Sequence, residues 1–190
     1  NGVISYQKAS GLAMFSGIVI FCFYSFIRLK EMLPVEEYGY DAIFFILLIL
    51  CFAWGGDTCA YFAGRAFGKH KLCPVVSPKK TVEGAIGGVL GTMVFGVLVT
   101  VIYSIAADRM EEFTRSNIGV SMYVIIALLA CVAAVLGIYG DLFASVVKRQ
   151  CGIKDYGTIF PGHGGILDRF DSVMFIAPFV TMVVIAAFYN

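Results

Sequence analysis

Charged side chains are concentrated in one stretch, residues 141–171, although only 14% of the chain is Lys, Arg, Asp or Glu. Three of its four acidic residues are predicted on two helices, one that ends in the stretch and one that begins in it. The candidate metal ligands are three carboxylates, Asp141, Asp168 and Asp171, and Ser145 shares a helix face with the first of them. Carboxylates on two helices that point at one place can hold a hard divalent cation. We therefore expect a Mg²⁺ site and leave a second metal ion open.

The same stretch carries side chains suited to phosphate. They are Lys148, Arg149, Lys154, His163 and Arg169. Gly164 and Gly165 permit a sharp turn and close backbone contact with a ligand. His163 is interpreted as a phosphate contact or a structural residue, because oxygen-rich sites favour magnesium over metals that prefer imidazole. Carboxylates, a divalent ion and surrounding cations together predict phosphoryl or nucleotidyl transfer. A salt-bridged loop between two helices is the alternative.

A second group of candidates precedes this stretch. Asp57 lies inside an apolar segment, where a carboxylate is costly and is usually functional, although pairing with a loop cation would also explain it. Ser77-Pro78-Lys79-Lys80-Thr81 is interpreted as a rigid turn, with Thr81 as the N-cap of the next helix. Lysines beside a helix N-terminus suit a phosphate, and an ordinary basic loop is the alternative. The substrate-binding candidates in this group are Asp57, Arg65, Ser77, Lys79, Lys80, Thr81 and Glu83.

Five apolar segments must position these side chains. They cover residues of about 10–28, 42–64, 85–107, 119–147 and 170–189. Each has about 19 residues or more, which is enough to cross a hydrocarbon core of about 30 Å as a helix. With 59% apolar residues, the chain is predicted to be all-α, a polytopic integral membrane protein with a single domain over residues 1–190. Glycines near the start of the third segment, Gly84, Gly87, Gly88 and Gly91, predict close helix packing.

The connecting loops differ in charge. Loops 65–83 and 148–169 hold nine Lys and Arg residues, whereas acids outnumber bases in loops 29–41 and 108–118. The positive-inside rule places the two basic loops in the cytoplasm. We therefore expect an active site on the cytoplasmic face of the cell inner membrane.

The motif residues have a recognisable order. Ser145-x-x-Lys148-Arg149, then Lys154-Asp155, then Pro161-x-His163-Gly164-Gly165-x-x-Asp168-Arg169-x-Asp171 resembles the signature of the phosphatidate cytidylyltransferases, also called CDP-diacylglycerol synthases. The stretch from Asp57 to Gly88 is similar to a second block of that family. Family members are usually longer, with further helices before this point, so we expect this chain to be the C-terminal part of a longer member.

The resemblance implies a reaction of phospholipid biosynthesis, in which CTP and phosphatidate give CDP-diacylglycerol and pyrophosphate. It implies Asp141 and Asp168 as metal ligands, with Ser145 and Asp171 close by. Phosphate contacts would come from Lys148, Arg149, Lys154, Arg169 and His163, and contacts to the nucleotide or the lipid headgroup from Arg65, Lys79 and Lys80. The implied partners are CTP, phosphatidate and membrane lipids, with no nucleic acid and with a homodimer left open. A CTP-dependent lipid kinase and an ion transporter are the alternatives.

Overall fold

The structure is a computed structural model that describes residues 6–109, 119–157 and 165–189. Its elements are α1 (Tyr6–Met32), α2 (Val35–Tyr38), α3 (Asp41–Phe67), β1 (Lys71–Cys73), β2 (Ser77–Thr81), α4 (Val82–Arg109), α5 (Val120–Gln150), the 3-10 helix η1 (Leu167–Arg169) and α6 (Val173–Tyr189). In α1, α3, α4 and α5 the chain is long and apolar enough to cross a membrane, and α6 is a shorter apolar helix. The predicted polytopic, helical membrane fold is confirmed.

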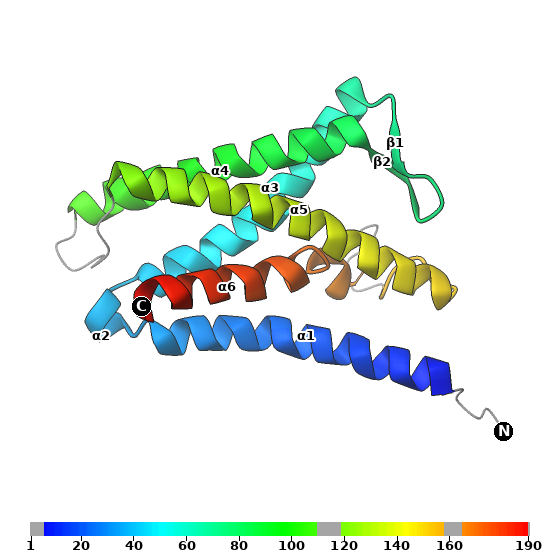
Figure 1. The fold of residues 1–190 in the computed structure, drawn as a ribbon, viewed down its shortest axis with the longest axis horizontal. Helices are drawn as coiled ribbons and strands as arrows, with labels where there is room; N and C mark the ends of the chain where they lie inside the picture. The colour runs from blue at the N-terminus through cyan, green and yellow to red at the C-terminus, as the bar shows by residue number, and fades with distance from the viewer. Residues whose placement is uncertain (1–5, 110–118, 158–164, 190) are drawn as a thin grey trace.

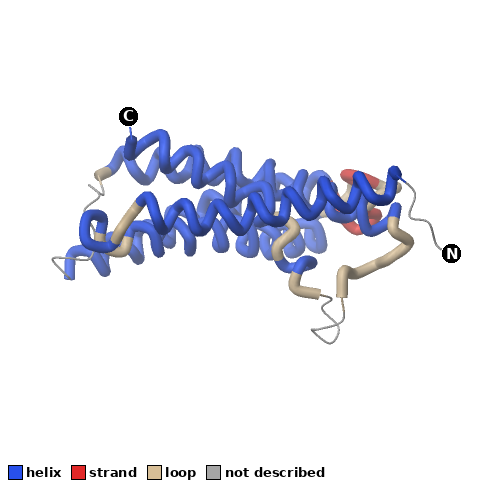
Figure 2. The backbone as a smooth tube through the Cα atoms, turned by 90° about the horizontal axis from the view of Figure 1, so that it is seen from below, coloured by secondary structure: helices blue, strands red, loops and turns tan. Residues whose placement is uncertain are grey.

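The helices form an elongated bundle. α4 packs along α3 and α5, and α6 packs against α1 and α5 (Figure 1). The β1–β2 hairpin, the end of α5 and the start of α1 lie at one end of the bundle, and α2 and the end of α6 lie at the other. A view turned by a right angle again places the strands at the end where α1 begins (Figure 2). The two cation-rich segments therefore share one end of the molecule, as the sequence predicted.

The central helix is α3, which contacts α1, α4, α5 and α6. Phe44, Leu48 and Phe52 recur every fourth residue and are fully buried, so one face of the first half of α3 forms the core. The second half of α3 carries Asp57 and leads to the hairpin. Burial of the first half therefore holds a carboxylate of the second half in a fixed place.

Glycines bring α4 against α3, as predicted. A Cβ atom at Gly87 would lie 2.2 Å from the Cβ of Ala63, and one at Gly91 would lie 2.3 Å from the Cβ of Cys59. Side chains larger than hydrogen cannot fit at either position without moving a helix. α3 is unbroken at its own Gly55-Gly56 pair, so that pair serves helix packing and does not bend the chain.

The segment after α3 contains a short antiparallel hairpin, so the prediction of a rigid turn at Ser77–Thr81 is wrong. Those residues are strand β2, whose Thr81 pairs with Lys71 and whose Ser77 pairs with Cys73. The chain reverses at residues 74–76. Side chains of adjacent strand residues point to opposite faces, so the hairpin determines which of its lysines points toward the bundle.

The hairpin is attached to the first turn of α4. The hydroxyl of Thr81 accepts a hydrogen bond from the N–H of Gly84 at 3.1 Å, which confirms Thr81 as the helix N-cap. The carboxylate of Glu83 accepts hydrogen bonds from the N–H groups of Lys69 and His70 and contacts the His70 ring at 2.6 Å. Both ends of the hairpin are therefore fixed to one helix.

The last helix begins later than the sequence suggested. α6 starts at Val173, so the prediction that Asp168 and Asp171 open this helix is wrong. Asp168 lies in η1 and Asp171 in the turn that follows. Both carboxylates nevertheless line the same pocket as Asp141 of α5.

Candidate active site

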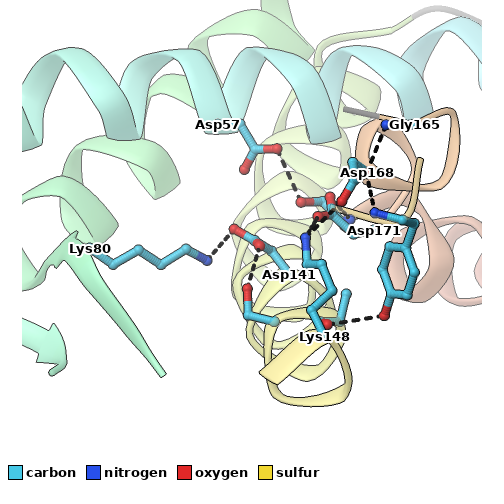
Figure 3. Close-up of polar contacts among 11 residues, drawn as sticks. Asp57, Lys80, Asp141, Lys148, Gly165, Asp168 and Asp171 are labelled. Carbon is cyan, nitrogen blue, oxygen red and sulfur yellow. Dashed lines mark hydrogen bonds and ion pairs between the residues drawn. The ribbon is translucent and has the colours of Figure 1, made fainter. Parts of the chain in front are cut away.

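Four carboxylates from distant parts of the chain line one pocket at the hairpin end of the bundle (Figure 3). Asp57 comes from α3, Asp141 from α5, and Asp168 and Asp171 from the segment before α6. Asp57 lies ten residues before the end of α3, and Asp141 nine before the end of α5. At 1.5 Å per residue, both lie about 14–15 Å below the helix ends. The pocket therefore reaches well below the ends of the long helices.

Asp141 is held by a lysine from the hairpin. The Lys80 ammonium lies 2.5 Å from Oδ2 of Asp141, and each side chain is 24% exposed. The Ser145 hydroxyl donates to Oδ1 at 3.4 Å, so the predicted sharing of a helix face is confirmed. Lys80 thus connects β2 to the middle of the site (Figure 3).

Asp168 organises the loop between α5 and α6. Lys148 donates to its Oδ1 at 2.9 Å, and the N–H groups of Tyr156 and Gly165 donate to its Oδ2 at 2.8 and 2.9 Å. Burial alone would raise the pKa of Asp168, but the hydrogen bond from Lys148 and the two backbone hydrogen bonds outweigh burial and hold the pKa below its ordinary value. Asp168 is therefore ionised near neutral pH and is largely surrounded by donors from the protein.

Asp171 is a buried residue of the pocket and is 7% exposed. Its Oδ1 accepts a hydrogen bond from the N–H of Ser172, and Lys148 approaches its Oδ2 at 3.9 Å. Burial, followed by repulsion from Asp141, raises the pKa of Asp171. Gly140 permits this arrangement, because a Cβ there would lie 2.7 Å from the backbone oxygen of Asp171. Negative charge is crowded at this point of the site.

Two contacts attach α3 to the segment before α6. The Ser172 hydroxyl donates to Oδ2 of Asp57 at 3.1 Å, and the indole N–H of Trp54 donates to the backbone oxygen of Arg169 at 3.0 Å. Trp54 and Asp57 lie on consecutive turns of α3, so one helix positions both ends of this segment. Asp57 is an exposed residue whose carboxylate faces the pocket.

The pocket has a volume of about 490 Å³ and combines both signs of charge. Arg65, Lys79 and Lys80 line it together with the four carboxylates and Thr81. Acidic groups at the base and basic groups around them form a mixed-charge site of a size that holds a small charged molecule. A phosphate-bearing ligand with a divalent ion matches this charge pattern.

The donor set fits Mg²⁺. The carboxylates and the Ser145 hydroxyl offer only oxygen atoms, which hard divalent cations prefer. Burial and then repulsion from Asp141 raise the pKa of Asp171, and a bound cation would relieve the repulsion. Within the described residues, however, no three acidic, histidine or cysteine side chains already stand together as a metal-binding group. Instead, Lys80 forms an ion pair with Asp141, and Lys148 forms one with Asp168.

Other predicted site residues lie around this centre or beyond the described part of the chain. Arg149 and Lys154 are exposed near the end of α5. Glu83 is occupied in fixing the hairpin, and Arg65 lies 3.5 Å from the hydroxyl of Tyr61. Ser77 opens β2, away from the carboxylates. Gly165 donates to Asp168, as described above. His163 and Gly164 lie outside the described residues.

Sequence reasoning missed three residues that position the site: Trp54, Tyr156 and Ser172. The Tyr156 hydroxyl donates to the backbone oxygen of Ala144 at 3.0 Å, and its ring lies 5.3 Å from the Lys148 ammonium. Trp54 could have been noticed as the single tryptophan of the chain, three residues before an intramembrane aspartate. Ser172 has no distinguishing sequence pattern, because its partner Asp57 lies 115 residues away in the chain. The partners of Tyr156 lie 8 to 12 residues away, but no helical or strand spacing connects them.

Comparison with known proteins agrees with this geometry. The sequence profile of the Cytidylyltransferase family matches residues 3–187. The chain belongs to the cytidylyltransferase family. The resemblance found in the motif residues is thereby confirmed over nearly the whole chain.

Relatives in this family carry a more specific name. The chain is 36% identical over 159 residues to the phosphatidate cytidylyltransferase of Bacillus subtilis. This match covers 84% of this chain and 52% of that protein. It is 39% identical over 145 residues to the enzyme of the same name from Staphylococcus haemolyticus, and 42% identical over 145 residues to that from Staphylococcus epidermidis. Both of these matches cover 76% of this chain and 50% of the relative. The chain spans about half the length of the curated relatives it matches.

Proposed function

We propose that this chain carries the reaction centre of a phosphatidate cytidylyltransferase, which transfers the cytidylyl group of CTP to phosphatidate. The single observation that carries the proposal is the pocket in which four carboxylates meet Arg65, Lys79 and Lys80 below the ends of membrane helices. A soluble triphosphate and a lipid phosphate can both reach such a place. Membership of the family and the names of the relatives support the choice of substrates.

The reaction needs positioning more than it needs a strong base. An oxygen of the lipid phosphate attacks the α-phosphorus of CTP, a new P–O bond forms, and the bond to the β-phosphate oxygen breaks to release pyrophosphate. The attacking phosphate monoester is already ionised at neutral pH, so no side chain has to remove a proton. Holding two anions together against their repulsion is therefore the main task of the protein.

In this proposal Asp141, Asp168 and Asp171 would hold Mg²⁺ together with the Ser145 hydroxyl, and a second metal ion stays open. When bound, Mg²⁺ supplies neutralisation of the phosphate oxygens during transfer. Ser145 lies 3.4 Å from Asp141 and holds that carboxylate in place. These residues supply ligands from two helices and one turn, so metal binding would also hold α5 and the segment before α6 together.

Basic side chains hold the phosphate groups in this proposal. Arg65, Lys79 and Lys80 line the pocket on the hairpin side and face the space where a triphosphate would lie. Lys148 has a supporting role, because it is 12% exposed and is bonded to Asp168. Arg149 and Lys154 are exposed at the entrance and can attract anionic substrates over a longer distance.

We also propose that this site faces the cytoplasm from the cell inner membrane. The positive-inside rule supports this orientation, because the hairpin and the loop after α5 lie at the same end of the bundle and carry most of the loop cations (Figure 1). CTP is a cytoplasmic nucleotide, so this orientation also brings the pocket to its substrate.

Product analysis tests the reaction. The protein in its full natural length is incubated with phosphatidate, Mg²⁺ and CTP labelled on either the α- or the γ-phosphate. The α-label should enter the lipid and the γ-label should appear in pyrophosphate, and Asp141→Asn should abolish both. Entry of the γ-label into lipid with release of CDP would identify a lipid kinase instead. If neither the α-label nor the γ-label of CTP enters the lipid, the proposal is overturned.

A further inference from the structure

Lys80 occupies the carboxylate that the proposed metal needs. Its ammonium lies 2.5 Å from Oδ2 of Asp141, and the other oxygen of that carboxylate is contacted by Ser145. An ammonium ion and a divalent cation seek the same negative oxygens, and both cannot hold the same oxygen at close range, because their positive charges repel. A cation that binds Asp141 must therefore displace Lys80 or share the site at a large electrostatic cost.

Lys148 differs from Lys80 in burial and in number of partners. Its side chain is 12% exposed, it lies between Asp168 and Asp171, and it packs over the Tyr156 ring. Lys80 is 24% exposed, and among the described residues Asp141 is its one ion-pair partner. Displacing Lys148 would break the loop structure around Asp168, whereas displacing Lys80 breaks a single contact. Lys80 is therefore the cation that can exchange.

Once displaced from Asp141, the Lys80 ammonium can move to another part of the same pocket. Lys80 lines the same pocket as Arg65 and Lys79, which is the basic side proposed to hold phosphate. The hairpin backbone is fixed to α4 at Thr81 and Glu83, so only the flexible side chain of Lys80 has to turn. A lysine side chain has four rotatable bonds and acts on phosphate as a point charge, which suits such a movement.

We propose that Lys80 and the divalent ion exchange on Asp141, so that metal binding releases Lys80 to hold the phosphates of the nucleotide. The inference rests on the proposed metal site and adds an energetic coupling to it. Metal binding frees Lys80 for the nucleotide, and the nucleotide draws Lys80 away from Asp141, so each ligand strengthens the other. Thermodynamic linkage requires the two effects to be equal.

The proposed exchange predicts that loss of the Lys80 charge raises the affinity for the metal. Removing the charge of Lys80 removes a competitor for Asp141, so the metal should bind more tightly even though the substrate binds more weakly. If Lys80 only attracted phosphate, its removal would weaken nucleotide binding and would not tighten metal binding at Asp141. Lys79 is the matched control, because it is the neighbouring lysine on β2, lines the same pocket and has no ion pair with any described residue.

The experiment measures metal binding directly. The full-length protein in detergent is titrated with Mn²⁺ in the absence of nucleotide and lipid, and free Mn²⁺ is counted by electron paramagnetic resonance. Lys80→Gln should bind Mn²⁺ about tenfold more tightly than the unaltered protein, as expected for the loss of one charge-assisted contact. Lys79→Gln should differ by less than about threefold, because an exposed charge is screened. Lys80→Arg keeps the competing charge and should not tighten binding.

The outcomes separate this inference from the function on which it rests. If Asp141→Asn weakens Mn²⁺ binding but Lys80→Gln does not tighten it, the exchange is overturned and the metal site stands. If Asp141→Asn leaves Mn²⁺ binding unchanged, both the metal assignment and the exchange are overturned. An equal gain for Lys79→Gln and Lys80→Gln would indicate a general charge effect and would also overturn the exchange. Circular dichroism checks that each variant is folded.

Discussion

The carboxylates Asp141 and Asp168 should differ in what their loss does to stability, although both are expected to be essential for activity. Asp168→Asn removes the charge that balances Lys148, in a pair whose side chains are 6% and 12% exposed. Asp141→Asn removes the partner of Lys80, in a pair whose side chains are both 24% exposed. Asp168→Asn leaves the buried ammonium of Lys148 poorly compensated. Asp141→Asn leaves the ammonium of Lys80, which water can reach.

The expected cost follows from this difference in burial. Breaking a buried ion pair by removing one partner costs about 3–5 kcal/mol. Asp171 remains 3.9 Å from Lys148, and asparagine can still accept one backbone hydrogen bond, so about 3 kcal/mol is expected for Asp168→Asn. Asp141→Asn should cost about 1 kcal/mol, because its ion pair is more solvated. The difference corresponds to a melting temperature lower by about 5 °C for Asp168→Asn.

Thermal unfolding in detergent, with a chelator and without nucleotide, measures this difference. The matched control is Lys148→Met, made alone and together with Asp168→Asn. The double variant should be more stable than the sum of the two single losses predicts, because neither member of the Lys148–Asp168 pair is left charged without the other. Equal melting temperatures for Asp141→Asn and Asp168→Asn would refute the conclusion that Asp168 organises the loop.

Three further predictions concern packing, positioning and orientation. Gly84→Ala should lower stability by about 1–3 kcal/mol in the same assay, because its Cβ would lie 2.8 Å from a backbone oxygen of α3, whereas Gly17→Ala has open space and should cost nothing. Ser172→Ala should lower kcat for CDP-diacylglycerol formation about tenfold with little change in KM, since its aspartate partner on α3 loses a hydrogen bond; an unchanged kcat would contradict a positioning role. Single cysteines at Val75, which is 91% exposed, and at Ile153 should be labelled only from the cytoplasm in a background without native cysteines, and labelling from outside would reverse the orientation.

The helices could be predicted from sequence because lipid leaves a long apolar segment few alternatives. The close approach of α4 to α3 was also predictable, since Gly87 and Gly91 have no other evident use in an apolar helix. Thr81 was recognised as an N-cap from its residue type and from the acid that follows. Each of these features has a signal in the residue types and spacings of a single segment.

The hairpin and the start of α6 could not be predicted in the same way. β1 has three residues and β2 begins with Ser77-Pro78, so neither shows the alternation of a strand. The hairpin depends on hydrogen bonds that Glu83 accepts from the backbone before β1. Asp168 is three residues from Asp171, which suggests a helix, but donors from Tyr156 and Gly165 hold it in another conformation.

The candidate site, like the fold, was predictable from the sequence only in part. The acidic and basic residue types were visible in the sequence, and so was their shared end of the bundle. Which lysine meets which carboxylate was not visible, because Lys80 and Asp141 belong to different elements whose packing depends on the glycines of α4. Such a pairing is a property of the tertiary structure, and no local pattern encodes it.

The short last helix has a consequence for the lipid. α6 has 17 residues and spans about 26 Å, whereas α5 has 31 residues and spans about 46 Å. The segment before α6 therefore lies within the height of its longer neighbours. If the phosphatidate reaction proposed above takes place here, we expect the pocket beside this segment to admit water to the level of the lipid phosphates. Lifting acyl chains into water would cost about 0.8 kcal/mol for each CH₂ group. In the proposed reaction the nucleotide would descend to the lipid, and the lipid could react without leaving its leaflet.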